Sequence, residues 1–295
     1  MVFGRLITRR ADSDHSVWLW AKSLCTLGVL IGLHLSALAV TPIPDPVACH
    51  KPVYLTFDTG HMGVAPLVAE VLKRQQVRVT FFAANEPTQE GDGSLGEHWA
   101  SWWRERALEG HDFASHTYDH VYWRADLAPV NSTALRFQMK PSAGPQAGKV
   151  MELSEAEYCE QLARSNRRLE AITGVPALPL FRAPGGKTSS ALLEAARRCP
   201  TPQGAGYEHV AWAAAGFLGD ELPSRPYPNS MLLKKALHSI RTGDILMAHL
   251  GIWSRQDPWA PAVLEPLIVG LKAQGFCFDT LRHHPLYRQH LAGVP

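Results

Sequence analysis

The feature that most constrains the fold of this chain is a repeated alternation of short β-rich runs with amphipathic helical patterns. The apolar, β-rich run at residues 53–57 predicts a buried strand. Residues 64–76 repeat apolar side chains at helical spacing, and residues 77–82 are again β-branched and aromatic. Later units predict helices over 154–173, 189–198, 230–241 and 263–274, and strands over 178–182, 209–212, 245–248 and 276–281. This alternation predicts an α/β fold with a parallel sheet, and the number of units favours closure into a barrel.

Two segments interrupt the alternation. Residues 84–98 are rich in Gly, Glu and Asp, and residues 126–149 are rich in Pro, Ser and Gly. Long connections without a clear period lie on the surface and often surround a binding site. We therefore interpret both segments as surface insertions over the mouth of the barrel.

Composition narrows the class of protein. The chain has 295 residues and is 46% hydrophobic, which is ample for one enzyme-sized core. Its 29 Lys and Arg against 27 Asp and Glu give a net charge of +2, and no basic stripe is present. We therefore expect no nucleic-acid partner, because surfaces that bind nucleic acids carry clustered basic side chains.

The first 39 residues have the character of an export signal. Basic residues, the last of them Lys22, precede an apolar stretch over 24–40, and Ala37-Leu38-Ala39 supplies a small-x-small cleavage site. We expect a signal peptide over 1–39 or, as the alternative, an uncleaved N-terminal anchor that would associate with the membrane. In either case residues 40–295 form a single exported domain that is periplasmic or faces the periplasm.

Polar side chains follow several of the β-rich runs. In parallel α/β folds such positions gather at one face, where catalytic residues are found. The candidates at this face are Asp58, His116, His120, Arg182 and His249. The spacing of His116 and His120 lets two imidazoles reach one cation from adjacent turns, while the alternative is two partly buried polar histidines.

Four segments carry a resemblance to a known family. They are Thr56-Phe57-Asp58-Thr59-Gly60, Ser115-His116-Thr117-Tyr118-Asp119-His120, Phe181-Arg182-Ala183-Pro184-Gly185-Gly186 and Ile245-Leu246-Met247-Ala248-His249. In this order they resemble the motifs of the polysaccharide deacetylase (NodB-homology, carbohydrate esterase family 4) family. The resemblance implies a distorted (β/α) barrel in which a divalent metal, most often Zn²⁺, activates water to remove an acetyl group from a glycan.

The resemblance also implies a role for each matching residue. It makes Asp58 the general base, His116 and His120 metal ligands, Arg182 the residue that orients the base, and His249 the acid for the leaving group. These roles suit the chemistry of metal-assisted hydrolysis. The substrate-binding residues implied by the same motifs are Pro184, Gly185, Gly186 and Trp212.

Two departures from the family pattern concern the metal and the acid. Thr59 stands where the family has a metal-binding carboxylate, so we expect weaker metal binding. His61 is a candidate substitute ligand, and the alternative is an ordinary loop histidine. Ala215 stands where a carboxylate often supports the acid histidine, and either Asp220 or a backbone carbonyl could replace it. Gly185 also stands where the family often has an aromatic side chain beside the pocket.

Cysteine usage fits an exported protein. Four cysteines lie beyond residue 40, and they allow two disulfides with three possible pairings. Closure of the barrel would bring the first and last strands together, which favours Cys49–Cys277. The second pair would then be Cys159–Cys199, between neighbouring helices.

The sequence thus leads to one main hypothesis and two alternatives. The main hypothesis is an exported, metal-dependent hydrolase that removes an N-acetyl group from an amino sugar of a cell-envelope polysaccharide. One alternative substrate is a lipid-linked amino sugar, because His116 to His120 followed by Trp123 is similar to a segment of undecaprenyl-phosphate aminoarabinose deformylases. The other alternative is a catalytically impaired glycan-binding module, motivated by Thr59 and Ala215.

Overall fold

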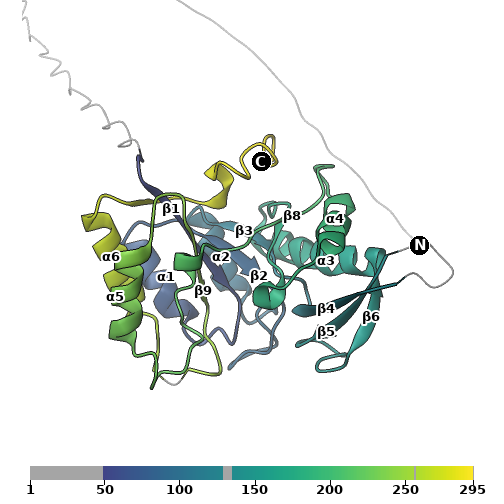
Figure 1. The fold of residues 1–295 in the computed structure, drawn as a ribbon, viewed down its shortest axis with the longest axis horizontal. Helices are drawn as coiled ribbons and strands as arrows, with labels where there is room; N and C mark the ends of the chain where they lie inside the picture. Colours follow the sequence, from purple (N-terminus) through teal and green to yellow (C-terminus); the bar gives the residue numbers. More distant parts are fainter. Residues whose placement is uncertain (1–48, 129–134, 256, 295) are drawn as a thin grey trace, which may run out of the picture. The chain divides into compact units, whose positions relative to one another are not determined.

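A curled parallel sheet forms the centre of the protein (Figure 1). The computed structural model describes residues 49–128, 135–255 and 257–294. In this part of the chain the strand order is β10-β1-β2-β3-β7-β8, and β9 also pairs with β1. The strands are β1 (Pro52–Asp58), β2 (Thr80–Ala83), β3 (Asp112–Ser115), β7 (Leu180–Phe181), β8 (Glu208–His209), β9 (Ile245–His249) and β10 (Cys277–Phe278). The predicted parallel α/β architecture is confirmed.

Helices connect the parallel strands, and their apolar faces cover the sheet. They are α1 (Ala65–Arg74), α2 (Ala100–Leu108), α3 (Glu155–Thr173), α4 (Ser190–Arg198), α5 (Asn229–Ser239) and α6 (Leu264–Ala273). The longest, α3, begins with a capping box in which the Ser154 side chain and the Glu157 carboxylate each accept from the other residue's backbone N–H. It ends at Gly174, whose left-handed conformation favours glycine.

A second, three-stranded antiparallel sheet lies beside α3 and α4 (Figure 1). Its strands are β4 (Val121–Leu127), β5 (Arg136–Pro141) and β6 (Met151–Ser154). The interpretation of residues 126–149 as a surface insertion was therefore wrong, because β5 buries Phe137 and Met139 in a core with α3 and α4. Helix α2 and strand β3 are also elements that the sequence pattern did not predict.

The two predicted disulfides are confirmed. Cys49–Cys277 ties the residues before β1 to β10, which pairs with the start of β1. Cys159–Cys199 joins α3 to the end of α4. The Cα atoms lie 5.8 and 5.3 Å apart in these pairs, within the range of ordinary disulfides.

The predicted N-terminal signal peptide or anchor over residues 1–39 lies outside the described residues. Within residues 49–128, 135–255 and 257–294, no helix has both the length and the apolar character to cross a membrane.

Candidate active site

The carboxyl ends of β1 and β9 bring two of the predicted site residues together. Asp58 and His249 are the last residues of these strands and stand opposite each other in the parallel register. Both line a cavity of about 540 Å³ at this end of the sheet. His116, His120 and Thr59 line the same cavity, so the structure gathers the sequence-predicted polar residues at one place.

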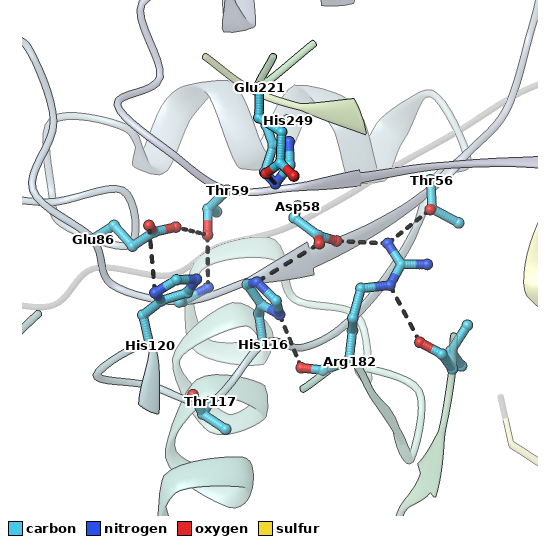
Figure 2. A network of polar contacts seen from close by, with 12 residues as sticks. Thr56, Asp58, Thr59, Glu86, His116, Thr117, His120, Arg182, Glu221 and His249 are labelled. Atoms are coloured by element: carbon cyan, nitrogen blue, oxygen red, sulfur yellow. Dashed lines mark hydrogen bonds and ion pairs between the residues drawn. The ribbon is translucent and has the colours of Figure 1, made fainter. Parts of the chain in front are cut away.

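Asp58 is buried against the guanidinium of Arg182 (Figure 2). Arg182 Nη1 donates to Asp58 Oδ1 at 2.6 Å and to Thr56 Oγ1 at 2.8 Å, and Nε donates to the Val210 carbonyl. Burial alone would raise the pKa of Asp58, but the positive charges of Arg182 and His249 outweigh burial and lower that pKa. Asp58 is therefore an ionised carboxylate able to accept a proton.

His249 is held by Asp220. The His249 backbone N–H donates to Asp220 Oδ2 at 2.7 Å, and Nδ1 lies 3.1 Å from the same oxygen. Burial lowers the pKa of His249, but the carboxylates of Asp220, Asp58 and Glu221 outweigh it and raise the pKa to about 9. The imidazole is therefore protonated at neutral pH and has a proton to give.

A tight turn after β3, not a helix, brings His116 and His120 together. Thr117 and His120 both adopt positive φ, at 59° and 48°, a backbone conformation uncommon for residues other than glycine. The turn is fixed by the Thr117 hydroxyl, which accepts from the Val121 N–H at 2.7 Å. The two imidazole rings lie with their centroids 4.8 Å apart. The expectation of two histidines on adjacent helical turns was wrong, although the rings do meet.

The hydrogen bonds of these histidines leave nitrogen lone pairs for a ligand. Nδ1–H of His116 donates to the Arg182 carbonyl at 2.9 Å, so Nε2 is the free acceptor and lies 3.7 Å from Asp58 Oδ2. Burial lowers the pKa of His116 to about 4, which keeps the ring neutral. His120 Nδ1 lies 2.5 Å from Ser142 Oγ. An imidazole held in this way through Nδ1 is typical of metal-binding histidines.

Glu86 is a cavity residue that the sequence reasoning missed. It follows β2 in the segment interpreted as a surface insertion, but its side chain is only 16% exposed. Glu86 Oε2 accepts from Thr59 Oγ1 at 2.6 Å, and Oε1 lies 3.9 Å from His120 Nδ1 (Figure 2). A polar residue soon after a parallel strand was the available signal, since the same rule had selected Asp58.

His61 does not reach this cavity in the structure. Its Nδ1 accepts from the Gly63 N–H at 3.0 Å, and its ring packs against Trp253. The ring lines a neighbouring pocket of about 220 Å³. The geometry therefore favours the interpretation of His61 as a loop histidine over that of a substitute ligand.

Comparison with known proteins agrees with the geometry. The sequence profile described as polysaccharide deacetylase matches residues 46–204, which include Asp58, both histidines of the turn and Arg182. The chain belongs to the polysaccharide deacetylase family. The predicted family is thereby confirmed, and the match covers three of the four motifs on which the prediction rested.

Relatives and solved structures of the family extend the likeness along the chain. A chitooligosaccharide deacetylase of Azorhizobium caulinodans is 26% identical over 78% of this chain and 92% of its own length. The peptidoglycan-N-acetylmuramic acid deacetylase PdaA of Bacillus subtilis is 25% identical over 78% of this chain and 70% of its own. The structure of a family 4 acetyl xylan esterase from Clostridium thermocellum, in complex with a cobalt ion, covers 83% of this chain and 93% of its own. Its TM-score is 0.57 at 20% identity, which supports the predicted distorted (β/α) barrel.

Against the polysaccharide deacetylase pattern, two departures have local replacements. Ala215 lacks a carboxylate, and Asp220 occupies the position against His249 Nδ1. Gly185 has no aromatic side chain, but the ring of Tyr122 lies directly beside it. A Cβ atom at position 185 would come within 2.9 Å of that ring. Both Tyr122 and Gly185 line the cavity, so an aromatic wall is present from a different element.

The remaining predicted substrate-binding residues divide into two groups. Trp212 lines the cavity together with Gly185. Pro184 is buried and is not among the residues that line the cavity, and its contact with substrate stays a prediction. Gly186 lies against the Trp212 ring, which would meet a Cβ at that position. Gly186 therefore supports the tryptophan and does not itself line the cavity.

Proposed function

We propose that this protein is a metal-dependent hydrolase that removes the N-acetyl group from an amino sugar of a glycan. The observation that carries the proposal is the juxtaposition of an ionised Asp58 and a protonated His249 at paired strand ends. A base and an acid of opposite protonation state on one cavity are what amide hydrolysis requires. A site that only bound glycans would need neither.

The metal would be held by His116 and His120, as predicted from the motifs. Two imidazoles, of which His116 is neutral with its free Nε2 near Asp58, suit a divalent ion of the zinc class. The polysaccharide deacetylase family and the cobalt-bound solved structure support this assignment. When bound, such an ion polarises the acetyl carbonyl and lowers the pKa of a coordinated water.

The residues of the chain would then move two protons. Asp58 accepts a proton from water while the water oxygen forms a bond to the carbonyl carbon. Before this step, Arg182 keeps Asp58 ionised. His249 donates its proton to the sugar nitrogen as the C–N bond breaks, and Asp220 stabilises the charged imidazole. The products are acetate and a free amino sugar, so all atoms of water and amide are accounted for.

The lining of the cavity favours an uncharged or amino-bearing glycan over a phosphate-linked sugar. Three carboxylates line it, Asp58, Glu86 and Glu221, and no Lys or Arg is found among its described lining residues. Phosphate groups select cationic side chains, which are missing from this lining. Trp212, Tyr122 and the 66% exposed Trp253 offer aromatic faces of the kind that pack against sugar rings.

We also propose that the protein acts outside the cytoplasm. The two disulfides support this, because such bonds persist in oxidising compartments. The predicted signal peptide or anchor over residues 1–39 supports the same location, and the catalytic domain would comprise residues 40–295. The glycan would then belong to the cell envelope.

The direct test is release of acetate from an oligomer of N-acetylglucosamine in the presence of Zn²⁺ or Co²⁺. We expect equal amounts of acetate and new free amine, and neither product after chelation of the metal. A parallel assay for formate on a formylated lipid-linked amino sugar tests the alternative substrate. Glycan binding without either acid in any of these assays would contradict the proposal and favour a binding module.

The support of His249 by Asp220 predicts a change in pH dependence. An acid catalyst must be protonated, so turnover falls as pH rises above its pKa, which is about 9 for His249. In Asp220→Asn we expect the alkaline limb of the pH–kcat profile to move down by about two pH units, toward the ordinary histidine pKa of about 6.5. The measurement is kcat between pH 5 and 10 for both proteins.

Glu221→Gln serves as the control for that shift. Glu221 Oε2 is 3.9 Å from His249 Nε2, so it raises the pKa of His249 without bonding to Nδ1. We expect a smaller displacement of the alkaline limb in this variant. An unchanged alkaline limb in Asp220→Asn would show that His249 is not the titrating acid.

A further inference from the structure

Glu86 is a partly buried carboxylate whose charge has no cationic partner in the described part of the chain. Two other carboxylates beside the site have charged partners, since Asp58 pairs with Arg182 and Asp220 with His249. No Lys or Arg among the described residues forms an ion pair with Glu86, whose side chain is only 16% exposed. Burying a carboxylate without an opposite charge costs free energy, so the position of Glu86 favours a bound positive charge nearby.

That carboxylate lies beside His120, which is in turn next to His116. Oε1 lies 3.9 Å from His120 Nδ1, and the rings of His120 and His116 are themselves 4.8 Å apart (Figure 2). Glu86 and both histidines line the same cavity. Two imidazoles and one carboxylate are the protein ligands of many catalytic zinc sites. In such sites the fourth coordination position is open for water.

Thr59 connects Glu86 to the position where a carboxylate was expected. The Thr59 hydroxyl accepts from the Ala84 N–H at 3.0 Å and donates to Glu86 Oε2 at 2.6 Å. A threonine hydroxyl is a poor metal ligand, but here it holds a carboxylate from the segment after β2 beside the same cavity. The negative charge missing from position 59 is therefore present within one hydrogen bond.

The segment that carries Glu86 is built to hold it. The Ser94 hydroxyl accepts from the Glu86 N–H at 2.9 Å and donates to the Ala84 carbonyl at 2.5 Å, while the Ser94 N–H donates to the Glu86 carbonyl at 3.0 Å. Ser94 is fully buried. Backbone fixed on both sides of a side chain limits its movement, which is how outer residues orient metal ligands.

We propose that Glu86 is the third protein ligand of the metal and replaces the carboxylate that Thr59 lacks. The proposal rests on the metal dependence proposed above, and it removes the reason to expect weak metal binding. It also distinguishes Glu86 from Glu221, a carboxylate of the same cavity that approaches His249 and not the histidine pair.

The experiment measures the affinity of the metal-free protein for Zn²⁺ by competition with a chromophoric chelator, together with the absorption spectrum of the Co²⁺ form. We expect Glu86→Gln to weaken Zn²⁺ binding by more than about 100-fold, since even the outer partners of metal ligands contribute about 10–100-fold. The Co²⁺ spectrum should change with the ligand set. Glu221→Gln removes an equal charge from the cavity and should leave both readouts unchanged.

A rescue variant separates ligation from folding. Thr59→Asp added to Glu86→Gln should restore Zn²⁺ affinity, because it returns a carboxylate to the neighbouring position. If His116→Ala abolishes binding while Glu86→Gln has no effect, the Glu86 assignment is overturned and the metal site stands. If neither variant changes the affinity, the histidine site and the Glu86 assignment both fail. If Glu221→Gln lost as much Zn²⁺ affinity as Glu86→Gln, the effect would come from the charge of the cavity alone. That result would overturn the role of Glu86 as a ligand.

Discussion

Replacing Asp58 with Asn is expected to lower turnover by about 10²–10⁴-fold, the range typical of a general base. The change removes the charge that accepts the proton, but keeps the shape of the side chain and an oxygen for the Arg182 Nη1 donor. Asp58 lies 3.7 Å from His116 Nε2 and is not among the proposed ligands, so metal content should not fall. The measurement is acetate release under saturating substrate, with metal analysis and circular dichroism on the same samples.

Asp112→Asn is the matched control for this prediction. Asp112 begins β3 at the end of the sheet opposite the cavity and pairs with Arg282. An Asp to Asn change there should leave turnover intact. If Asp58→Asn turns over substrate at the parental rate, Asp58 is not the base, whatever the metal does.

The strand-end residues of the site could be predicted from sequence because parallel strands impose a simple rule. Asp58 and His249 each end an apolar run, and the carboxyl ends of parallel strands meet at one edge. The same rule places Arg182 directly after β7. Barrel closure also predicted Cys49–Cys277, since the first and last strands pair.

Residues on irregular segments could not be placed in this way. Glu86 and Asp220 lie between regular elements, where no hydrophobic period reports which side chain turns inward. Their inward positions depend on contacts distant in sequence, such as Asp220 with the end of β9. The turn carrying His116 and His120 relies on positive φ values that residue type alone does not indicate.

The small second sheet was missed for a different reason. Strand β5 does carry a period-two pattern, with Phe137 and Met139 buried and their neighbours more exposed. The Pro, Ser and Gly residues around this short pattern are typical of turns, and they led to the prediction of a surface insertion instead of a strand. Antiparallel strands inside a parallel α/β domain also run against the rhythm of the rest of the chain, so the global pattern did not support the local one.

The second large effect is expected on stability. Arg182→Leu should lower the free energy of unfolding by about 3–5 kcal/mol, the usual cost of leaving one partner of a buried ion pair without the other. Arg182 is fully buried, and its loss also leaves Thr56 Oγ1 and the Val210 carbonyl without this donor. The measurement is denaturant unfolding of both proteins with disulfides intact.

The double variant Asp58→Asn, Arg182→Leu decides how much of that loss comes from the stranded charge. A neutral Asn needs no counter-charge, so we expect the double variant to be more stable than Arg182→Leu alone. Simple addition of the two single effects would instead mean that Arg182 stabilises the fold through packing against Phe82 and Trp212. Recovery in the double variant, with no recovery of turnover, would mean that the buried arginine is retained because the base beside it must stay ionised.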